Sequence, residues 1–216
     1  MKKPFSAWRE GLPVYLPCLA VGAAGAAAVW PHPVVAVPLF LLALGLFSLY
    51  FFRDPVRRVA AEPNEAVAPA DGAVVGLEDL EDTPHYDGPC RRLSIFLSVL
   101  DVHINRAPVE GEVVDVSYRP GKFKNAMKAE TSECNESNAV RMATGHGPVT
   151  VRQISGAVAR RIVCRCGVGA RLEKGQKFGM IKLGSRTELY LPPGTEFCVN
   201  LKDKVRAGST VVARFP

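Results

Sequence analysis

Residues 179–192 are Gly179-Met180-Ile181-Lys182-Leu183-Gly184-Ser185-Arg186-Thr187-Glu188-Leu189-Tyr190-Leu191-Pro192, a strand-like run that a glycine interrupts. A glycine inside a strand weakens it, so it usually marks a bulge, a bend or a place where another group approaches the backbone. The run predicts two short strands, at 180–183 and 188–191. Gly184 and Ser185 occupy the special backbone position between them.

The chain beyond residue 58 consists mostly of short β-rich runs separated by turn residues. Asp71-Gly72 is a turn signal between two short strands within 66–76. One helical turn is expected, at 157–160 or at 99–104. Further strands are expected at Arg92–Leu97, Gly111–Tyr118, Ala139–Met142, Val149–Ser155, Arg161–Val168, Glu196–Asn200 and Thr210–Phe215. These runs predict a mainly β domain over residues 59–216, a sandwich or barrel with few short helices.

Two C-terminal segments repeat one spacing of apolar residues around a glycine. The pattern apolar-x-x-Gly-x-x-apolar occurs at Leu172, Gly175 and Phe178 and again at Val205, Gly208 and Val211. Both segments resemble the turns of biotinyl- or lipoyl-type hybrid barrels. Carriers of that type present a modifiable lysine at a hairpin tip, whereas the tip here would present Gly184-Ser185 or Pro192-Pro193-Gly194. The likeness is therefore one of fold.

A long uncharged segment precedes the β-rich part. From Gly11 to Phe52 the sequence contains no Lys, Arg, Asp or Glu, and one membrane-spanning helix needs only about 20 apolar residues. The centre reads Trp30-Pro31-His32-Pro33, whose prolines break a helix and favour a turn with Trp30 at the membrane interface. We therefore expect a transmembrane helical hairpin, with helices at about 14–30 and 34–52.

Positive charges flank this membrane hairpin, which we assign to an N-terminal part of residues 1–58. The flanking residues are Lys2, Lys3 and Arg9 before it and Arg53, Arg57 and Arg58 after it. Because positive residues stay on the cytoplasmic side, both ends and the following domain are expected in the cytoplasm, at the inner membrane. The alternatives are an interfacial or re-entrant hairpin and a cleavable signal peptide followed by one anchor. The second apolar run argues against the signal peptide.

Charge and cysteine usage narrow the partners further. A net charge of +6 and a pI of about 9.1 suit either nucleic acid or an anionic membrane. The apolar segment favours the membrane, so no nucleic-acid partner is expected. Of the six cysteines, Cys164 and Cys166 form a lone C-x-C pair, and no second pair completes a zinc site. We expect reduced thiols and no metal.

Gly184 and Ser185 also form a chemically distinctive pair. The Ser185 hydroxyl adjoins the Gly184 carbonyl, and the missing side chain on Gly184 permits a kinked backbone. Attack of that hydroxyl on the carbonyl would convert the peptide bond into an ester. Elimination would then cleave the chain and leave a dehydroalanine, which hydrolyses to a pyruvoyl group. Gly-Ser alone is a common turn, so other motifs must support this interpretation.

Four motifs occur in order along the chain: Phe51-Phe52-Arg53-Asp54-Pro55, Ala68-Pro69-Ala70-Asp71-Gly72, Phe96-Leu97-Ser98-Val99-Leu100-Asp101-Val102-His103-Ile104-Asn105-Arg106-Ala107-Pro108 and Lys182-Leu183-Gly184-Ser185-Arg186. Together they resemble the short, membrane-bound class of phosphatidylserine decarboxylases, pyruvoyl enzymes that make their own cofactor. The resemblance spans most of the chain. It implies cleavage between Gly184 and Ser185, a heterodimer of a large chain (1–184) and a small chain (185–216), and a pyruvoyl group derived from Ser185.

The resemblance also implies three catalytic residues. Asp71 would orient His103, and His103 would take the proton of the Ser185 hydroxyl. Locally, Asp71 reads equally as a turn cap and His103 as a structural residue. Longer members of the family carry a second histidine three residues after the first, where this sequence has Arg106. His103 is therefore asked to serve both cleavage and decarboxylation.

Other polar residues near these motifs read as ordinary structural or loop residues. Asp101 and Asn105 flank His103 and read as polar groups at strand ends. Residues 135–138, Asn-Glu-Ser-Asn, could contact a polar head group but read as a solvated loop. No role is predicted for any of them.

The implied reaction converts phosphatidylserine, a serine phospholipid held in the membrane, to phosphatidylethanolamine and carbon dioxide in phospholipid biosynthesis. The pyruvoyl group would accept the electron pair that departing carbon dioxide leaves behind. Archaetidylserine as the substrate stays open, because lipid tails leave no recognisable motif. Two other functions also stay open: a membrane-anchored carrier or binding module with a lipoyl-like barrel, and a membrane-anchored serine hydrolase. The hydrolase would lack the Gly-x-Ser-x-Gly elbow around its serine.

Overall fold

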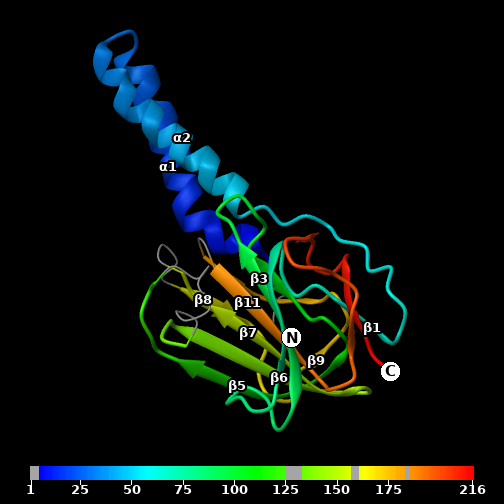
Figure 1. Cartoon of the computed structure of the whole chain (residues 1–216). Coiled ribbons are helices and arrows are strands. Elements are labelled where there is room, and N and C mark those ends of the chain that lie inside the picture. The colour runs from blue at the N-terminus through cyan, green and yellow to red at the C-terminus, as the bar shows by residue number, and fades with distance from the viewer. Residues whose placement is uncertain (1–4, 125–132, 157–160, 183–184) are drawn as a thin grey trace. The chain divides into compact units, whose positions relative to one another are not determined.

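The computed structural model describes residues 5–124, 133–156, 161–182 and 185–216. The chain divides into two compact units, Met1–Pro55 and Val56–Pro216. The first contains the helices and the second contains the strands (Figure 1). The expected combination of an N-terminal helical hairpin with a mainly β domain is confirmed.

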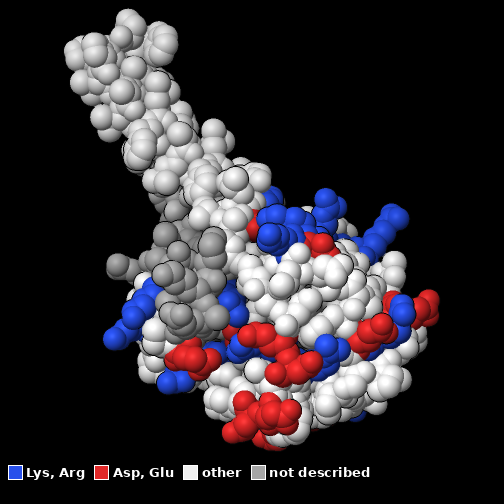
Figure 2. Space-filling view, viewed as in Figure 1, with Lys and Arg blue, Asp and Glu red and all other residues white. Residues whose placement is uncertain are grey.

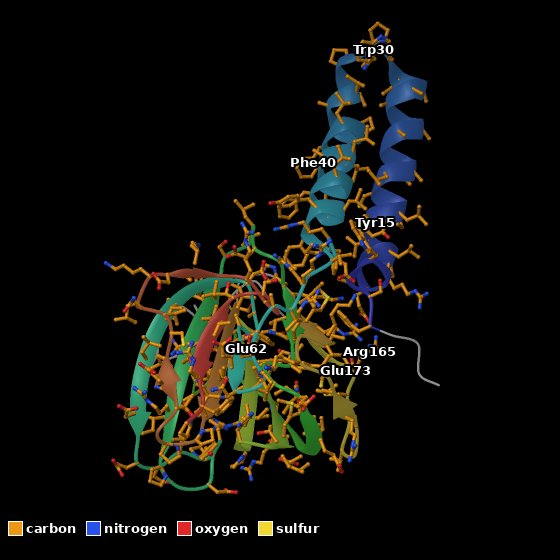
Figure 3. All side chains as sticks on the ribbon, turned by 90° about the vertical axis from the view of Figure 1, so that its right-hand side faces the viewer. Tyr15, Trp30, Phe40, Glu62, Arg165 and Glu173 are labelled. Carbon is orange, nitrogen blue, oxygen red and sulfur yellow. The ribbon has the colours of Figure 1, made fainter. Side chains whose placement is uncertain are left out.

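The first unit consists of α1 (Ala7–Val29), a 3-10 turn (Pro33–Val35) and α2 (Ala36–Phe51). The first helix begins seven residues before the expected position, since its first turn also accommodates charged residues. By length and composition, both apolar stretches, Ala7–Val29 and Pro33–Phe51, are long enough to cross a membrane. Figure 3 places Trp30 at the turn between the two helices, as expected for an interfacial residue.

Glycines let the two helices approach closely. A Cβ atom on Gly22 would meet Leu42 at 2.8 Å, and one on Gly45 would meet Leu19 at the same distance. Small residues at such contacts are typical of helix pairs in lipid. Figure 2 shows no charged side chain on the visible surface of the far end of this hairpin.

The described part of the second unit contains a curled, antiparallel eight-stranded sheet (Figure 1). Its strands, in spatial order, are β13 (Lys204–Val205), β2 (Gly72–Leu80), β3 (Cys90–Leu97), β11 (Ser185–Leu191), β7 (Gly147–Ile154), β6 (Ser137–Thr144), β5 (Gly111–Arg119) and β9 (Arg171–Leu172). Strand β11 lies near the middle of the sheet, between β3 and β7. Ser185 is its first residue, so the strand begins three residues earlier than the sequence predicts.

Two three-stranded sheets complete the unit, and they are related by an internal repeat. One is β1 (Glu65–Val67), β14 (Val211–Arg214) and β12 (Glu196–Phe197), and the other is β4 (Ile104–Arg106), β10 (Lys177–Ile181) and β8 (Ile162–Cys164). In the first, the Ala68 amide donates to Thr210 and the Gly208 amide donates to Ala68. In the second, the Ala107 amide donates to Gln176 and the Gly175 amide donates to Ala107.

The repeat brings two equivalent turns together. Gly175 and Gly208 both adopt positive φ, at 78° and 71°, a conformation that only glycine takes readily. A Cβ on Gly208 would lie 3.5 Å from the Gly175 Cα atom. The repeated glycine spacing therefore corresponds to two turns that pack against each other. Each turn lies beside an Ala-Pro segment.

An apolar core fills the interior of the β unit. Its fully buried members include Leu93, Ile95, Val151, Leu189 and Leu191. They come from β3, β7 and β11, whose alternate side chains face inward. This core makes the centre of the sheet a rigid support for whatever lies at the start of β11.

Two expected local elements differ from the structure. The helical turn expected at 99–104 is wrong, because Ser98–Asp101 forms a tight turn in which the Asp101 carboxylate accepts hydrogen bonds from the Ser98 amide and hydroxyl, both at 2.7 Å. The alternative at 157–160 lies outside the described residues. The strand expected over 161–168 is shorter, at Ile162–Cys164.

Candidate active site

Ser185 lies buried at the start of the central strand. Its backbone pairs with Leu97 of β3, and its side chain is fully buried. In the part of the chain that the structure describes, Ser185 Oγ has no hydrogen-bond partner. A buried hydroxyl without a partner is costly in a folded protein, and a reactive role is one explanation for it. Gly184, on the other side of the predicted scissile bond, lies outside the described residues.

The ring of His103 is buried and oriented by the backbone. Its Nδ1 atom lies 2.9 Å from the carbonyl oxygen of Asp101, and a carbonyl only accepts hydrogen bonds. Nδ1 therefore carries the proton in the neutral ring, and Nε2 carries the lone pair. The geometry prepares Nε2 to act as a base.

Contacts on two strands place His103 and Ser185 at the same end of the site. The Ile181 amide donates to the His103 carbonyl at 3.1 Å, so the chain passes His103 shortly before it enters β11. Two residues further along, Asn105 Nδ2 donates to Thr187 Oγ1 at 3.0 Å. Side chains two residues apart along extended chain share a face. The side chain of His103 therefore lies on the same face of its segment as that of Asn105, and the side chain of Ser185 lies on the same face of β11 as that of Thr187. These two faces are turned toward each other.

Asp71 makes its described contacts with groups other than His103. Its Oδ1 accepts from the Ala207 amide at 2.8 Å, and its Oδ2 lies 2.7 Å from Arg57 Nη2 in an ion pair shielded from solvent. Asp71 and Asp101 together line a pocket of about 460 Å³. An action of Asp71 on His103 stays a prediction, since the hydrogen bond described for the ring is the one that Nδ1 donates to the Asp101 carbonyl.

Gly72 explains why a glycine follows Asp71. It adopts a φ of 148°, and a Cβ atom there would collide with the Phe96 carbonyl oxygen. The Asp-Gly pair is therefore fixed by the close approach of β2 to β3. This packing keeps Asp71 at the edge of the same region that contains Leu97 and Ser185.

A buried polar network lies beside the site, and the sequence contains only a weak signal that predicts it. Asn105 is fully buried and is not a solvent-facing strand end. Its Oδ1 accepts from Gln153 Nε2 at 2.9 Å, and Gln153 Oε1 accepts from Asn138 Nδ2 at 3.0 Å. Residues 135–138 are buried as well, so their interpretation as a solvated loop is wrong. An asparagine two residues after the candidate base was the available signal.

Arg106, which replaces the second histidine of longer family members, has a structural contact. Its Nη1 donates to the Gly175 carbonyl at 2.9 Å, and its side chain is buried. It therefore supports one of the two repeated glycine turns.

The cysteines are free thiols, as the sequence predicts. Sγ of Cys164 lies 3.5 Å from Sγ of Cys166, and the hydrogen bond from Cys166 lowers the pKa of the Cys164 thiol. Within the described ranges, no group of three or more His, Cys, Asp or Glu side chains is arranged to hold a metal ion.

Comparison with known proteins identifies the family. Residues 44–213 match the family described as phosphatidylserine decarboxylase. The chain is 40% identical to a phosphatidylserine decarboxylase proenzyme of Magnetococcus marinus, over 99% of this chain and 97% of the relative. It is 42% identical to one of Carboxydothermus hydrogenoformans, over 99% of both chains, and 47% identical to one of Gluconacetobacter diazotrophicus, over 78% and 76%. The chain belongs to the phosphatidylserine decarboxylase family.

Proposed function

We propose that this protein is a self-processing, pyruvoyl-dependent decarboxylase that converts phosphatidylserine to phosphatidylethanolamine and carbon dioxide. The single observation that carries the proposal is the buried hydroxyl of Ser185, which has no hydrogen-bond partner among the described residues and lies at the end of the site where His103 lies. Family membership favours this function over a carrier module or a serine hydrolase. The relatives are named proenzymes, which supports maturation from a precursor.

The proposed maturation begins with Ser185. His103 Nε2 accepts the hydroxyl proton, because Nδ1 is committed to the Asp101 carbonyl. The freed oxygen attacks the Gly184 carbonyl carbon, an ester forms, and the Gly184–Ser185 amide bond breaks. Loss of the α proton of residue 185 then expels the Gly184 carboxylate and leaves dehydroalanine. Water converts dehydroalanine to a pyruvoyl group and releases ammonia, so atoms and electrons balance.

Residue 185 is a suitable place for the group. The group forms from the serine itself, so it inherits the buried position at the start of β11 and the support of β3. When present, a pyruvoyl group supplies a carbonyl that binds the substrate amine and draws electrons from the bond to the departing carboxylate. His103, oriented through Nδ1, is the residue we assign to hold and return a proton during that reaction.

Asp71 has a separate proposed role. A carboxylate near an imidazole favours the protonated ring, so Asp71 would support His103 while it holds the serine proton. Its ion pair with Arg57 and its bond to the Ala207 amide fix the carboxylate in place. Arg53, Arg57 and Arg58 are the flanking cations proposed to suit an anionic lipid surface. Of these, Arg57 also pairs with Asp71 within the β unit.

The proposed location is the cytoplasmic face of the inner membrane. The two apolar helices would anchor the enzyme where its phospholipid substrate lies, and the basic residues at both ends favour the cytoplasm. The mature enzyme would be a heterodimer of residues 1–184 and 185–216.

The test uses the purified full-length protein with vesicles that contain phosphatidylserine. Wild-type protein is expected to form phosphatidylethanolamine and carbon dioxide in equal amounts, and Ser185→Ala is expected to form neither. Vesicles of archaetidylserine, assayed in parallel, identify the preferred backbone. Product formation by Ser185→Ala would refute the proposal.

A further inference from the structure

A second cluster of buried groups lies on the face of β11 opposite Ser185. Arg186, Glu188 and Tyr190 alternate with the inward-facing residues of this strand. All three are at most 2% exposed. The maturation chemistry uses none of them, although Arg186 is bonded directly to Ser185. Charged groups are rarely buried this deeply without a role or a partner.

Glu188 is the centre of this cluster. Its Oε1 accepts from Arg186 Nε at 2.9 Å, and its Oε2 accepts from the Tyr190 hydroxyl at 2.7 Å and from Arg152 Nη1 at 3.2 Å. Arg186 also donates from Nη2 to Ser94 Oγ on β3 at 2.7 Å. The guanidinium of Arg186 is therefore bound at two points, one on its own strand and one on the neighbouring strand.

The charges of the cluster are stable near neutral pH. Burial alone would raise the pKa of Glu188, but Arg186 and Arg152 outweigh it and hold this pKa below its usual value. Burial, followed by the charge of Glu188, raises the pKa of Tyr190, so the phenol keeps its proton and remains a donor. The contacts to Arg186 thus persist under the conditions in which the enzyme would work.

Cleavage gives these contacts a specific consequence, which rests on the proposed function. Residue 185 becomes a chain end and stays attached to the protein only through Arg186. Among the described strands, its backbone pairs with β3 alone, whereas Arg186 lies between Phe96 of β3 and Ile154 of β7. Chain ends are poorly ordered unless they are tied down, while a catalytic group must be held within about 0.5 Å.

We propose that Arg186 is a positioning residue that fixes the new N-terminus of the small chain, and with it the pyruvoyl group, through Glu188 and Ser94. Its side chain points away from the site, so it acts through residue 185 and not on the substrate. In the uncleaved precursor the peptide bond to Gly184 provides the same restraint. The effect of Arg186 on the position of residue 185 therefore appears only after cleavage.

Arg186→Lys tests the proposal because it keeps the positive charge and removes the two-point contact. The matched control is Arg91→Lys. Arg91 donates from Nε to Asp79 at 2.6 Å and from Nη1 to the Thr195 carbonyl at 2.5 Å, and it lies opposite Leu191, at the other end of β11 from the cleaved bond. For each protein we would measure the cleaved fraction, kcat per pyruvoyl group, KM, and hydrogen exchange of residues 186–191.

The expected result separates cleaved from uncleaved protein. Arg186→Lys should still cleave, and its kcat per pyruvoyl group should fall at least about tenfold, since small misplacements of reacting groups cost up to about 100-fold. KM should change little. Hydrogen exchange at residues 186–191 should rise in the cleaved variant and stay unchanged when Arg186→Lys is combined with Ser185→Ala. The control should resemble wild type in every measurement.

Several outcomes would overturn the proposal. Unchanged kcat per pyruvoyl group in Arg186→Lys would remove its positioning role, and an equal rise of exchange with and without cleavage would make the role purely structural. If Arg186→Lys fails to cleave, Ser94→Ala, which removes one contact and leaves Arg186 in place, is judged by the same two criteria. Failure of wild-type protein to cleave would instead refute the proposed function, so the two failures are distinguishable.

Discussion

The site depends on two residues whose side chains have opposite surroundings. Ser185 has a buried hydroxyl without a hydrogen-bond partner among the described residues, whereas His103 is held through Nδ1 by a backbone carbonyl. A serine hydroxyl is a poor nucleophile until a base takes its proton, and imidazole titrates near pH ~6.5. The pair therefore combines a hydroxyl free to react with a base whose tautomer is already fixed.

His103→Ala is expected to remain mostly a single chain of 216 residues, because no other oriented base is proposed for the Ser185 proton. Any fraction that does mature should decarboxylate slowly, since the proton donor is missing. A denaturing gel measures cleavage, and carbon dioxide release per pyruvoyl group measures turnover. Normal cleavage would remove His103 from maturation, and normal turnover per pyruvoyl group would remove it from decarboxylation.

Asp71→Asn is expected to slow cleavage more than turnover. The amide keeps the hydrogen bond from the Ala207 amide but loses the charge that would support protonated His103. The matched control is Asp203→Asn, because Asp203 also accepts a backbone hydrogen bond, from the Asn200 amide at 2.8 Å. Cleavage rates measured during cell-free synthesis compare the two. Equal rates in both variants would contradict a specific role of Asp71.

At the scale of elements, the sequence predicted the strands of the large sheet better than the short ones. Val149–Ser155 and Gly111–Tyr118 were close to β7 and β5, because long runs of β-forming residues carry a clear local signal. Strand β4 has three residues and exists because β10 pairs with it. Such a pairing depends on contacts between residues far apart in the sequence, so no local sequence pattern predicts it.

The polar groups around the site were misjudged for a related reason. Asn105 read as a polar group at a strand end and Asn138 as part of a solvated loop, yet Thr187 and Gln153 from distant strands satisfy their hydrogen bonds and allow them to be buried. Burial of an amide depends on such partners, and one sequence does not reveal them. Asp71, His103 and Ser185 were predicted as site residues because they lie in motifs that resemble the family, and their roles stay a prediction.

The buried cluster on β11 predicts a specific acid sensitivity. The folded-state pKa of Glu188 lies below the ordinary value of 4.5, so its contribution to stability is fully present above that pH. The contribution is lost as the pH falls through the folded-state value. Glu188→Ala leaves two buried arginines without this partner and should lower the free energy of unfolding by about 3–5 kcal/mol.

Urea unfolding of the uncleaved Ser185→Ala precursor, with and without Glu188→Ala, measures this effect at pH 7 and pH 4. The difference in unfolding free energy between the two proteins should be large at pH 7. It should be smaller at pH 4, because the contribution of Glu188 declines below its ordinary pKa of 4.5. A stability difference near zero at pH 7 would show that the cluster contributes nothing to the fold.

At the scale of the whole molecule, the two units would divide the work of a membrane enzyme. The helices would anchor the protein in the membrane that holds the proposed substrate, while every proposed catalytic residue belongs to Val56–Pro216. The small chain, 185–216, contributes β11 to the centre of the large sheet and β14 to a smaller one. Cleavage would therefore leave two chains interlocked by strand pairing.

A chain that begins at Arg53 is expected to cleave itself, because the site lies beyond the helices. It should process detergent-dispersed substrate better than substrate in vesicles, since it lacks the apolar anchor. Comparing both substrate forms with the full-length enzyme measures the contribution of the anchor. A folded but uncleaved truncated chain would show that the helices shape the site.

The most direct test of the proposed self-cleavage between Gly184 and Ser185 is an intact-mass measurement of purified full-length protein. We expect two chains. One contains residues 1–184 and ends in a carboxylate, and the other contains residues 185–216 and begins with a pyruvoyl group. Treatment with a carbonyl reagent should add mass to the small chain alone. A single uncleaved chain in an active preparation, or a small chain that begins with an intact serine, would contradict the account.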